Sequence, residues 1–186
     1  SVDITTPQSV AIFGHRGIDR ADPDFFAAFI LNTILGGNGI ESRLTAEVRE
    51  KRGLTYGIST VLLTKDHANV MLGPVASAND RIGAAIEVIR DEWSKLAHDG
   101  VTAEELQAAQ TYLTGAYPLR FDGNSQIARI LVGMQRQGLG LDYINTRNAR
   151  INAVTLSEIN RVAARLLQPE ALNFVVVGQP TGLKED

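Results

Sequence analysis

The residues best suited to chemistry are three histidines, two carboxylate pairs, and a segment that leads from a glycine-rich corner through a charged stretch to a lone Tyr. The histidines stand at positions 15, 67 and 98, and none has another histidine at the i+3 or i+4 spacing of helical zinc sites. The pairs Asp91-Glu92 and Glu104-Glu105 would point in different directions on a helix. We therefore predict no metal site in this chain, and expect these groups to be caps or solvated surface.

The segment Ile34–Tyr56 reads ILGGNGIESRLTAEVREKRGLTY. Its Gly-Gly-Asn-Gly corner could suggest a phosphate-binding loop, but it lacks the Lys-Ser/Thr that follows such a loop, and it comes after a predicted helix rather than a strand. No GxSxG nucleophile elbow is present either. These absences leave neither a nucleotide site nor an activated serine as a supported hypothesis.

Composition narrows the class of protein without naming it. The 186 residues are 44% hydrophobic, and 18 Lys and Arg stand against 21 Asp and Glu, with both signs interspersed, so no nucleic-acid partner is predicted. The absence of Cys excludes disulfides and thiolate chemistry, and no apolar run approaches a membrane span, so no membrane insertion is expected. The first residue is Ser rather than Met, which suggests that a signal peptide or a preceding domain was removed.

The hydrophobic periodicity predicts an α+β fold with an antiparallel or mixed β-sheet and helices packed on one face. We expect strands at 8–15, 54–64, 68–76 and 171–178, and helices at 22–36, 41–52, 79–99, 102–117, 125–137, 142–150 and 155–167. Pro74 should place its strand at a sheet edge or end the pairing early. No repeat or interior linker is visible, so residues 1–186 are interpreted as one domain.

Several local signals predict how the helices begin and end. Thr102 with Glu105, and Thr155 with Glu158, have the spacing of capping boxes. Asn79 could cap the long helix that follows it. The sequence also predicts a left-handed Gly53 at the end of the short charged helix, and within that helix an ion pair between Arg43 and Glu47.

The segment 32–60 resembles the C-terminal-half signature of the pitrilysin, insulinase and mitochondrial processing peptidase family of zinc peptidases. That signature is approximately L-G-G-G-x-x-S-R-L-x-x-x-V-R-E-x-x-G-L-x-Y. The matching positions are Leu35, Gly36, Gly37, Gly39, Ser42, Arg43, Leu44, Val48, Arg49, Glu50, Gly53, Leu54 and Tyr56. The order of strands and helices also resembles the family's half-domain over nearly the whole chain.

The resemblance implies that residues 1–186 form a C-terminal half-domain that lacks the zinc motif HxxEH and is inactive alone. Zinc would be held by an N-terminal half or a partner subunit, and the substrate would be an unfolded peptide. In this family an Arg and a Tyr seven residues later contact substrate carbonyl oxygens, and Arg49 with Tyr56 reproduces that spacing. Gly36, Gly37 and Gly39 would let the substrate backbone approach closely. The compartment is unknown, with a periplasmic location expected by resemblance if the source is bacterial.

Three alternatives stay open at this point. The same architecture serves as a non-catalytic core subunit of a respiratory complex, and a stand-alone peptide-binding domain is also conceivable. Without the resemblance, Arg49 would be a helix-surface ion-pair partner and Tyr56 a half-buried strand residue on one face with Leu54 and Ile58. The glycines would then simply form a tight turn.

Overall fold

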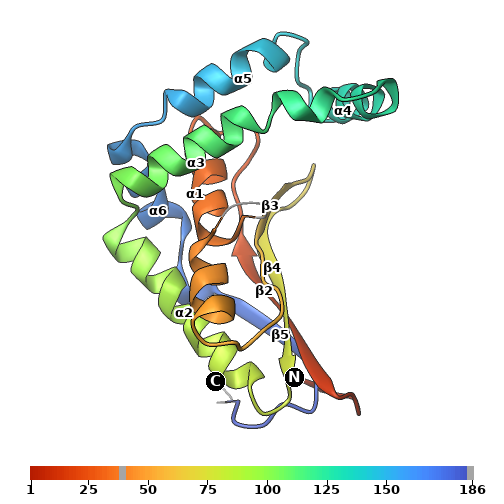
Figure 1. The fold of residues 1–186 in the computed structure, drawn as a ribbon, viewed down its shortest axis with the longest axis vertical. Coiled ribbons are helices and arrows are strands. Elements are labelled where there is room, and N and C mark those ends of the chain that lie inside the picture. The colour runs from red at the N-terminus through yellow and green to blue at the C-terminus, as the bar shows by residue number, and fades with distance from the viewer. Residues whose placement is uncertain (38–40, 184–186) are drawn as a thin grey trace.

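The structure is a computed structural model, and it describes residues 1–37 and 41–183. Its centre is a five-stranded sheet with strand order β1-β5-β2-β4-β3 (Figure 1). The strands are β1 (Val2–Asp3), β2 (Gln8–Arg16), β3 (Val61–Thr64), β4 (Asn69–Ala78) and β5 (Asn173–Gly178). Strand β1 runs parallel to β5, and every other neighbouring pair is antiparallel. The predicted mixed sheet is therefore confirmed.

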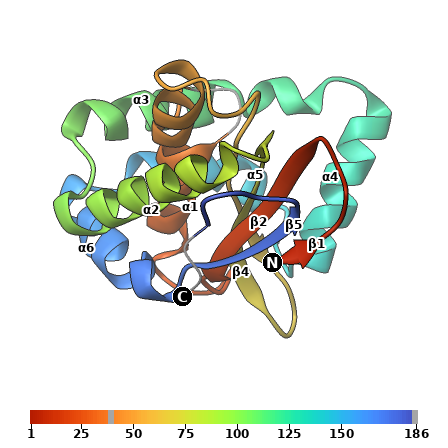
Figure 2. The same ribbon diagram turned by 90° about the horizontal axis from the view of Figure 1, so that it is seen from below.

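The helices lie mainly on one side of this sheet. They are α1 (Phe25–Gly36), α2 (Ile82–Asp99), α3 (Ala103–Gly115), α4 (Asn124–Arg136), α5 (Tyr143–Asn152) and α6 (Leu156–Leu166), with a π-helix η1 (Thr45–Glu50) and 3-10 turns η2 (Pro118–Phe121) and η3 (Pro169–Ala171). Figure 1 shows α1, α2 and α6 together against one face. In Figures 1 and 2, α4 projects past the sheet, away from α6. In the part of the chain that the structure describes, no helix is long and apolar enough to cross a bilayer.

The two faces of the sheet differ because side chains alternate along each strand. On β2, Ala11 and Phe13 are buried beneath the helices and join the main hydrophobic core, while Val10 and Ile12 point away from it and are 44% and 45% exposed. Pro74 and Val175 pair with Ile12 from the two neighbouring strands. These residues define what we call the open sheet face: Val10, Ile12, Pro74 and Val175.

His15 lies near the end of β2, as predicted, and is buried under α2. The indole Nε1 of Trp93 donates a hydrogen bond to His15 Nε2 at 3.1 Å. Because indole can only donate, His15 Nε2 is an acceptor, and the ring proton sits on Nδ1, which donates to the carbonyl of Arg16 at 2.7 Å. Burial lowers the pKa of His15. The side chain is therefore a neutral core residue, not a metal ligand.

Two predicted elements are shorter than expected. The strand expected at 54–64 is regular only over β3, although an isolated bridge joins Ile58 to Val75. The helix expected at 41–52 is instead the π-helix η1, in which Lys51 N bonds to the carbonyl of Ala46 five residues earlier. The pairing of β4 with β3 stops at Leu72, two residues before Pro74. For this pair of strands, Pro74 therefore has the predicted effect of ending the pairing early.

Two predicted side-chain contacts are wrong. Asn79 does not cap α2, since its side chain accepts from Ser9 Oγ and donates to the carbonyl of Thr6, which ties the start of β2 to the end of β4. Arg43 does not pair with Glu47. Its guanidinium instead forms a bidentate pair with Glu105, at 2.7 and 2.8 Å.

The carboxylate of Glu47 has other partners. It accepts hydrogen bonds from Arg52 and Lys51, which lower the pKa of Glu47 to about 2. The predicted capping boxes at Thr102 and Thr155 are both present.

Candidate functional site

Arg49 lies in the last turn of η1, where the chain changes direction. The buried side chain of Val48 anchors this turn in the core, and the carbonyls of Val48 and Arg49 accept from the amides of Leu54 and Gly53 at 2.9 Å each. Gly53 has φ +58°, a left-handed conformation that glycine adopts without steric cost, as predicted. This reversal sends the chain back beside the helix. Irregular π-type turns of this kind occur frequently at functional sites.

Tyr56 follows the reversal, in a loop that is held firmly although it is not a strand. The hydroxyl oxygen of Thr55 lies 2.7 Å from the carbonyl oxygen of Ala76 and 2.9 Å from that of Gly57, and its single proton is shared between these two acceptors. On either side, Ser77 Oγ donates to the carbonyl of Leu54, and Ile58 bridges to Val75. The backbone on both sides of Tyr56 is thus fastened to β4, which leaves its side chain free to project.

The Arg49 and Tyr56 side chains lie side by side at the surface, and we call them the Arg–Tyr pair. The Arg49 Cζ atom is 5.7 Å from the centroid of the Tyr56 ring, within the range of a cation–π contact. Tyr56 is 93% exposed, so the alternative in which it would be a half-buried strand residue is wrong. The Arg49 side chain is 48% exposed and has a loose ion pair with Glu50, with Nε 3.4 Å from Oε1. Both side chains therefore offer donors to a molecule outside this chain.

The glycine corner begins where α1 ends. A Cβ added at Gly36 would lie 2.5 Å from Thr60 Oγ1, and Thr60 N donates to the carbonyl of Gly36 at 2.7 Å. A Cβ at Gly37 would lie 2.7 Å from the carbonyl oxygen of Thr33. At Gly36 the close backbone approach that glycine permits is thus to this chain's own Thr60. Gly39 lies outside the described residues.

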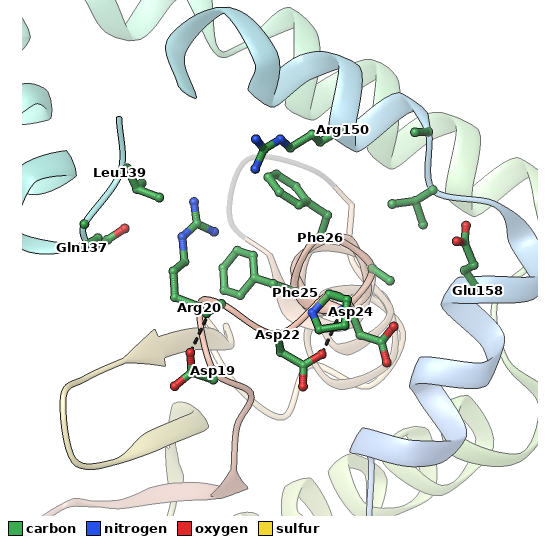
Figure 3. A pocket seen from close by; sticks show the side chains of 16 residues that line it. Asp19, Arg20, Asp22, Asp24, Phe25, Phe26, Gln137, Leu139, Arg150 and Glu158 are labelled. Carbon is green, nitrogen blue, oxygen red and sulfur yellow. Dashed lines mark hydrogen bonds between the residues drawn. The ribbon is translucent and has the colours of Figure 1, made fainter. Parts of the chain in front are cut away.

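A cavity of about 660 Å³ opens between the start of α1 and the segments around α5 (Figure 3). Asp22 and Asp24 line this cavity. Both are bound by arginines of α6, with 2.6 Å between Arg161 Nη2 and Asp24 Oδ1 and 2.7 Å between Arg165 Nη2 and Asp22 Oδ2. These hydrogen bonds lower the pKa of both aspartates. The carboxylates are therefore neutralised by α6 and serve to attach it to the start of α1. Neither member of the Arg–Tyr pair lines this cavity.

The residues present do not fit a zinc ion. Among residues 1–37 and 41–183, no group of three or more His, Cys, Asp or Glu side chains is placed to hold a metal. His15 is engaged with Trp93, and His98 Nδ1 lies 3.3 Å from the carbonyl of Ser94 in the last turns of α2. The metal requirement of a zinc peptidase is not met by these side chains.

A mixed sheet with helices on one face and an exposed Arg–Tyr pair agree with the half-domain of a zinc peptidase that the resemblance led us to expect, and no metal-ligand cluster is found among the described residues. The comparison with known proteins gives the family. Residues 2–113 match the model described as the Peptidase M16 inactive domain, and the chain belongs to this family.

Individual relatives agree with this assignment. An uncharacterized zinc protease of Streptomyces coelicolor is 32% identical over 165 residues, which cover 87% of this chain and 35% of that protein. The crystal structure of a peptidase M16 inactive domain from Pseudomonas fluorescens superposes with a TM-score of 0.85 at 27% identity, over 99% of this chain and 43% of the other. A Helicobacter pylori protein named as a non-peptidase homolog is 24% identical over 173 residues, 92% of this chain and 40% of that protein. The chain thus spans well under half the length of the curated relatives it matches.

Proposed function

We propose that residues 1–186 are a single C-terminal half-domain of a zinc metalloendopeptidase, or of the partner subunit that completes one, and that Arg49 and Tyr56 bind the substrate. The observation that carries this proposal is the Arg–Tyr pair itself, two side chains with hydrogen-bond donors that lie side by side on an exposed surface, with Arg49 Cζ 5.7 Å from the Tyr56 ring centroid. The family's description as an inactive domain supports the expectation that this chain does not cleave peptides alone.

The chemistry of the pair suits a peptide substrate. When a peptide bond is hydrolysed, negative charge develops on the carbonyl oxygen, and donors already in position stabilise that charge at no cost in reorganisation. The phenol O–H of Tyr56 offers one such donor. Arg49 offers a planar, permanently charged fork that Lys cannot reproduce. The anchored backbone around Tyr56 limits the entropy lost when the substrate binds.

The zinc, in this proposal, belongs to an N-terminal half or a partner subunit. Two observations support the need for such a partner. The chain corresponds to only 35% of the Streptomyces coelicolor relative. It also exposes Ile12 and Val175 on the open sheet face, at 45% and 59%, and contiguous exposed apolar surface commonly marks a docking site. Gly36, Gly37 and Gly39 are proposed to let the peptide backbone approach closely, as the resemblance implies. At Gly36, the close contact with Thr60 also requires glycine, because a Cβ there would collide with the Thr60 side chain.

Replacing Tyr56 with Phe in the complete protein, or in this chain mixed with its zinc-bearing half, tests the proposal. We expect the turnover number to fall about 10- to 1000-fold, the range found when one preorganised donor is removed. Because the side chain is 93% exposed, the free energy of unfolding should change by less than about 0.5 kcal/mol. Cleavage of an unfolded peptide and chemical denaturation give the two measurements.

Two matched variants test whether a loss of turnover is specific to the Arg–Tyr pair. Arg49→Lys should also reduce turnover because the fork is lost. Arg52→Lys keeps the charge at an exposed position three residues further on and should not reduce turnover. Turnover at the parental rate in Tyr56→Phe would refute the catalytic role.

A non-catalytic scaffold of the same architecture is the second candidate, and the relative named as a non-peptidase homolog favours it. In that case the complete protein would cleave no peptide with or without added zinc. The Tyr56→Phe variant would then leave assembly with the partner unchanged.

A further inference from the structure

A second cavity, of about 370 Å³, lies between α1, β3, η2, α4 and α5, and it is lined by arginines. Its wall contains the side chains of Arg20, Arg120, Arg129 and Arg147. Aromatic rings complete the wall: Phe25, Phe29, Tyr117 and Tyr143. The volume falls within the range of cavities that hold small ligands. Neither member of the Arg–Tyr pair lines this cavity, so a ligand bound here would be independent of the proposed peptidase role.

Arg147 is the most deeply placed of the four arginines. It is only 5% exposed, and its Cζ atom stacks 4.2 Å from the Tyr117 ring centroid. Nη1 donates to the carbonyl of Leu113 at 3.1 Å and to Asn148 Oδ1 at 3.0 Å, both neutral acceptors. Burial is the largest influence on the pKa of Arg147 and lowers it, although Tyr143 and Tyr117 act in the opposite direction. A buried cation with only neutral partners is unusual, because its desolvation is normally offset by a carboxylate.

Arg20 closes the cavity on the side of α1. Its Cζ atom lies 4.0 Å from the ring centroid of Phe25 and 5.1 Å from that of Tyr143. Its Nε atom is buried and has no hydrogen-bond acceptor. Figure 3 shows the Arg20 side chain reaching from its loop toward Gln137 and Leu139, which line both cavities. One of its donors is therefore already dehydrated without a partner.

The charges in this cavity are not balanced by acidic residues. No Asp or Glu is among the described residues that line it. Across residues 1–37 and 41–183, no ion pair joins any of the four arginines to a carboxylate. This contrasts with Arg161 and Arg165, which are held by aspartates, and with the net charge of −3 for the whole chain. Four like charges around one concave wall repel one another, and an anion between them would offset that repulsion.

We propose that this cavity is a binding site for a small oxyanion, a carboxylate or a phosphate group, carried by a molecule that can also stack on its aromatic wall. Arginine forks match the geometry of both groups and bind them through paired N–H donors. Arg147 and Arg20 supply the preorganised base of the site. Arg120 and Arg129, which are exposed at the rim, close on the ligand from η2 and α4.

Calorimetric titration of the 186-residue chain in low-chloride buffer tests the site, with inorganic phosphate in one series and succinate in another. At least one of the two anions should bind saturably with one site per chain. Arg120→Gln and Arg129→Gln should each weaken that binding by about tenfold, the effect of losing one hydrogen bond to a charged group. The anion that binds more tightly identifies the ligand as a phosphate or a carboxylate.

Arg136→Gln is the matched control. Arg136 is exposed on the same helix as Arg129, does not line the cavity, and its replacement changes the net charge of the chain equally. Arg136→Gln should bind the anion like the parent, and thermal melts should show that all three variants remain folded. The site is refuted if neither anion binds the parent, or if Arg136→Gln weakens binding as much as Arg129→Gln does.

Discussion

The partner of Arg43 offers a sharp test of the tertiary structure. Spacing along the helix favours Glu47, four residues away, whereas the structure places Arg43 against Glu105 at the start of α3. Arg43 Nη2 also donates to the carbonyl of Gly100 at 2.9 Å. Glu105 Oε2 in turn accepts from Thr102 N at 2.8 Å within the capping box. Replacing Arg43 with Met removes the guanidinium and keeps the apolar stem.

The expected cost of Arg43→Met follows from the burial of the pair. Fully exposed ion pairs contribute about 0 to 1 kcal/mol, and breaking a fully buried pair costs about 3 to 5 kcal/mol. The two side chains are 20% and 28% exposed, which places this pair between those limits. We expect Arg43→Met to lower the free energy of unfolding by about 2 kcal/mol. For a chain of this size the melting temperature should fall by about 4 to 8 °C.

A pair of double-mutant cycles, measured by urea denaturation, decides between the two partners. Arg43→Met combined with Glu105→Gln should show a coupling energy of about 1 to 2 kcal/mol, whereas Arg43→Met combined with Glu47→Gln should show almost none. A coupling below about 0.5 kcal/mol for Arg43 with Glu105 would refute the assigned contact. The reverse ranking of the two cycles would refute it as well.

The same pair should respond to acid. Burial alone would raise the pKa of Glu105, but the hydrogen bonds from Arg43 and from the Thr102 amide together outweigh it, and the net pKa is lowered. A carboxyl group whose folded pKa is lowered contributes stability above its unfolded pKa and loses it as the pH falls through the folded value. The coupling of Arg43 with Glu105 should therefore shrink once the pH drops below the ordinary glutamate pKa.

Two further predictions concern the core. Gly36→Ala should lower the free energy of unfolding by about 1 to 3 kcal/mol, because the added Cβ would lie 2.5 Å from Thr60 Oγ1. The control is Gly115→Ala, at a helix position where an added Cβ would meet open space, and in the same urea titration it should be neutral or stabilising. The pKa of His15 is lowered by burial, so the unfolded chain binds the proton more readily and stability should fall as the pH drops below about 6.5. Denaturation at about pH 7.5 and about pH 5.5 should show this loss in the parent, and His15→Gln should have a smaller one.

The fold was predictable from local patterns. The alternation along β2 and the helical spacing of Ile82, Ile89 and Trp93 in α2 each follow from one periodicity, and both elements form as expected. The two capping boxes were predicted from residues three positions apart, and both are present. These features depend on neighbours in the sequence, which is why sequence patterns predict them well.

The candidate site was predictable only in part. The family signature selects Arg49 and Tyr56, and their roles in catalysis stay a prediction. What the sequence did not show is that Tyr56 stands in a loop, held by a hydrogen bond from Thr55 to Ala76 of β4 and by one from Ser77 of β4 to Leu54. Nor did it indicate the arginine-lined cavity. Arg20, Arg120 and Arg147 are far apart in the chain, and no local spacing connects them.

The sequence by itself therefore determined the α+β class, the order of β2 to β5 and of the helices, the two capping boxes and the absence of a histidine motif for zinc. Each of these depends on backbone preferences and side-chain periodicity over a few residues. The tertiary structure alone decided that Arg43 pairs with Glu105 and that the four arginines meet at one cavity. Such contacts join residues distant in the chain, and which pairs form depends on how the helices pack on the sheet.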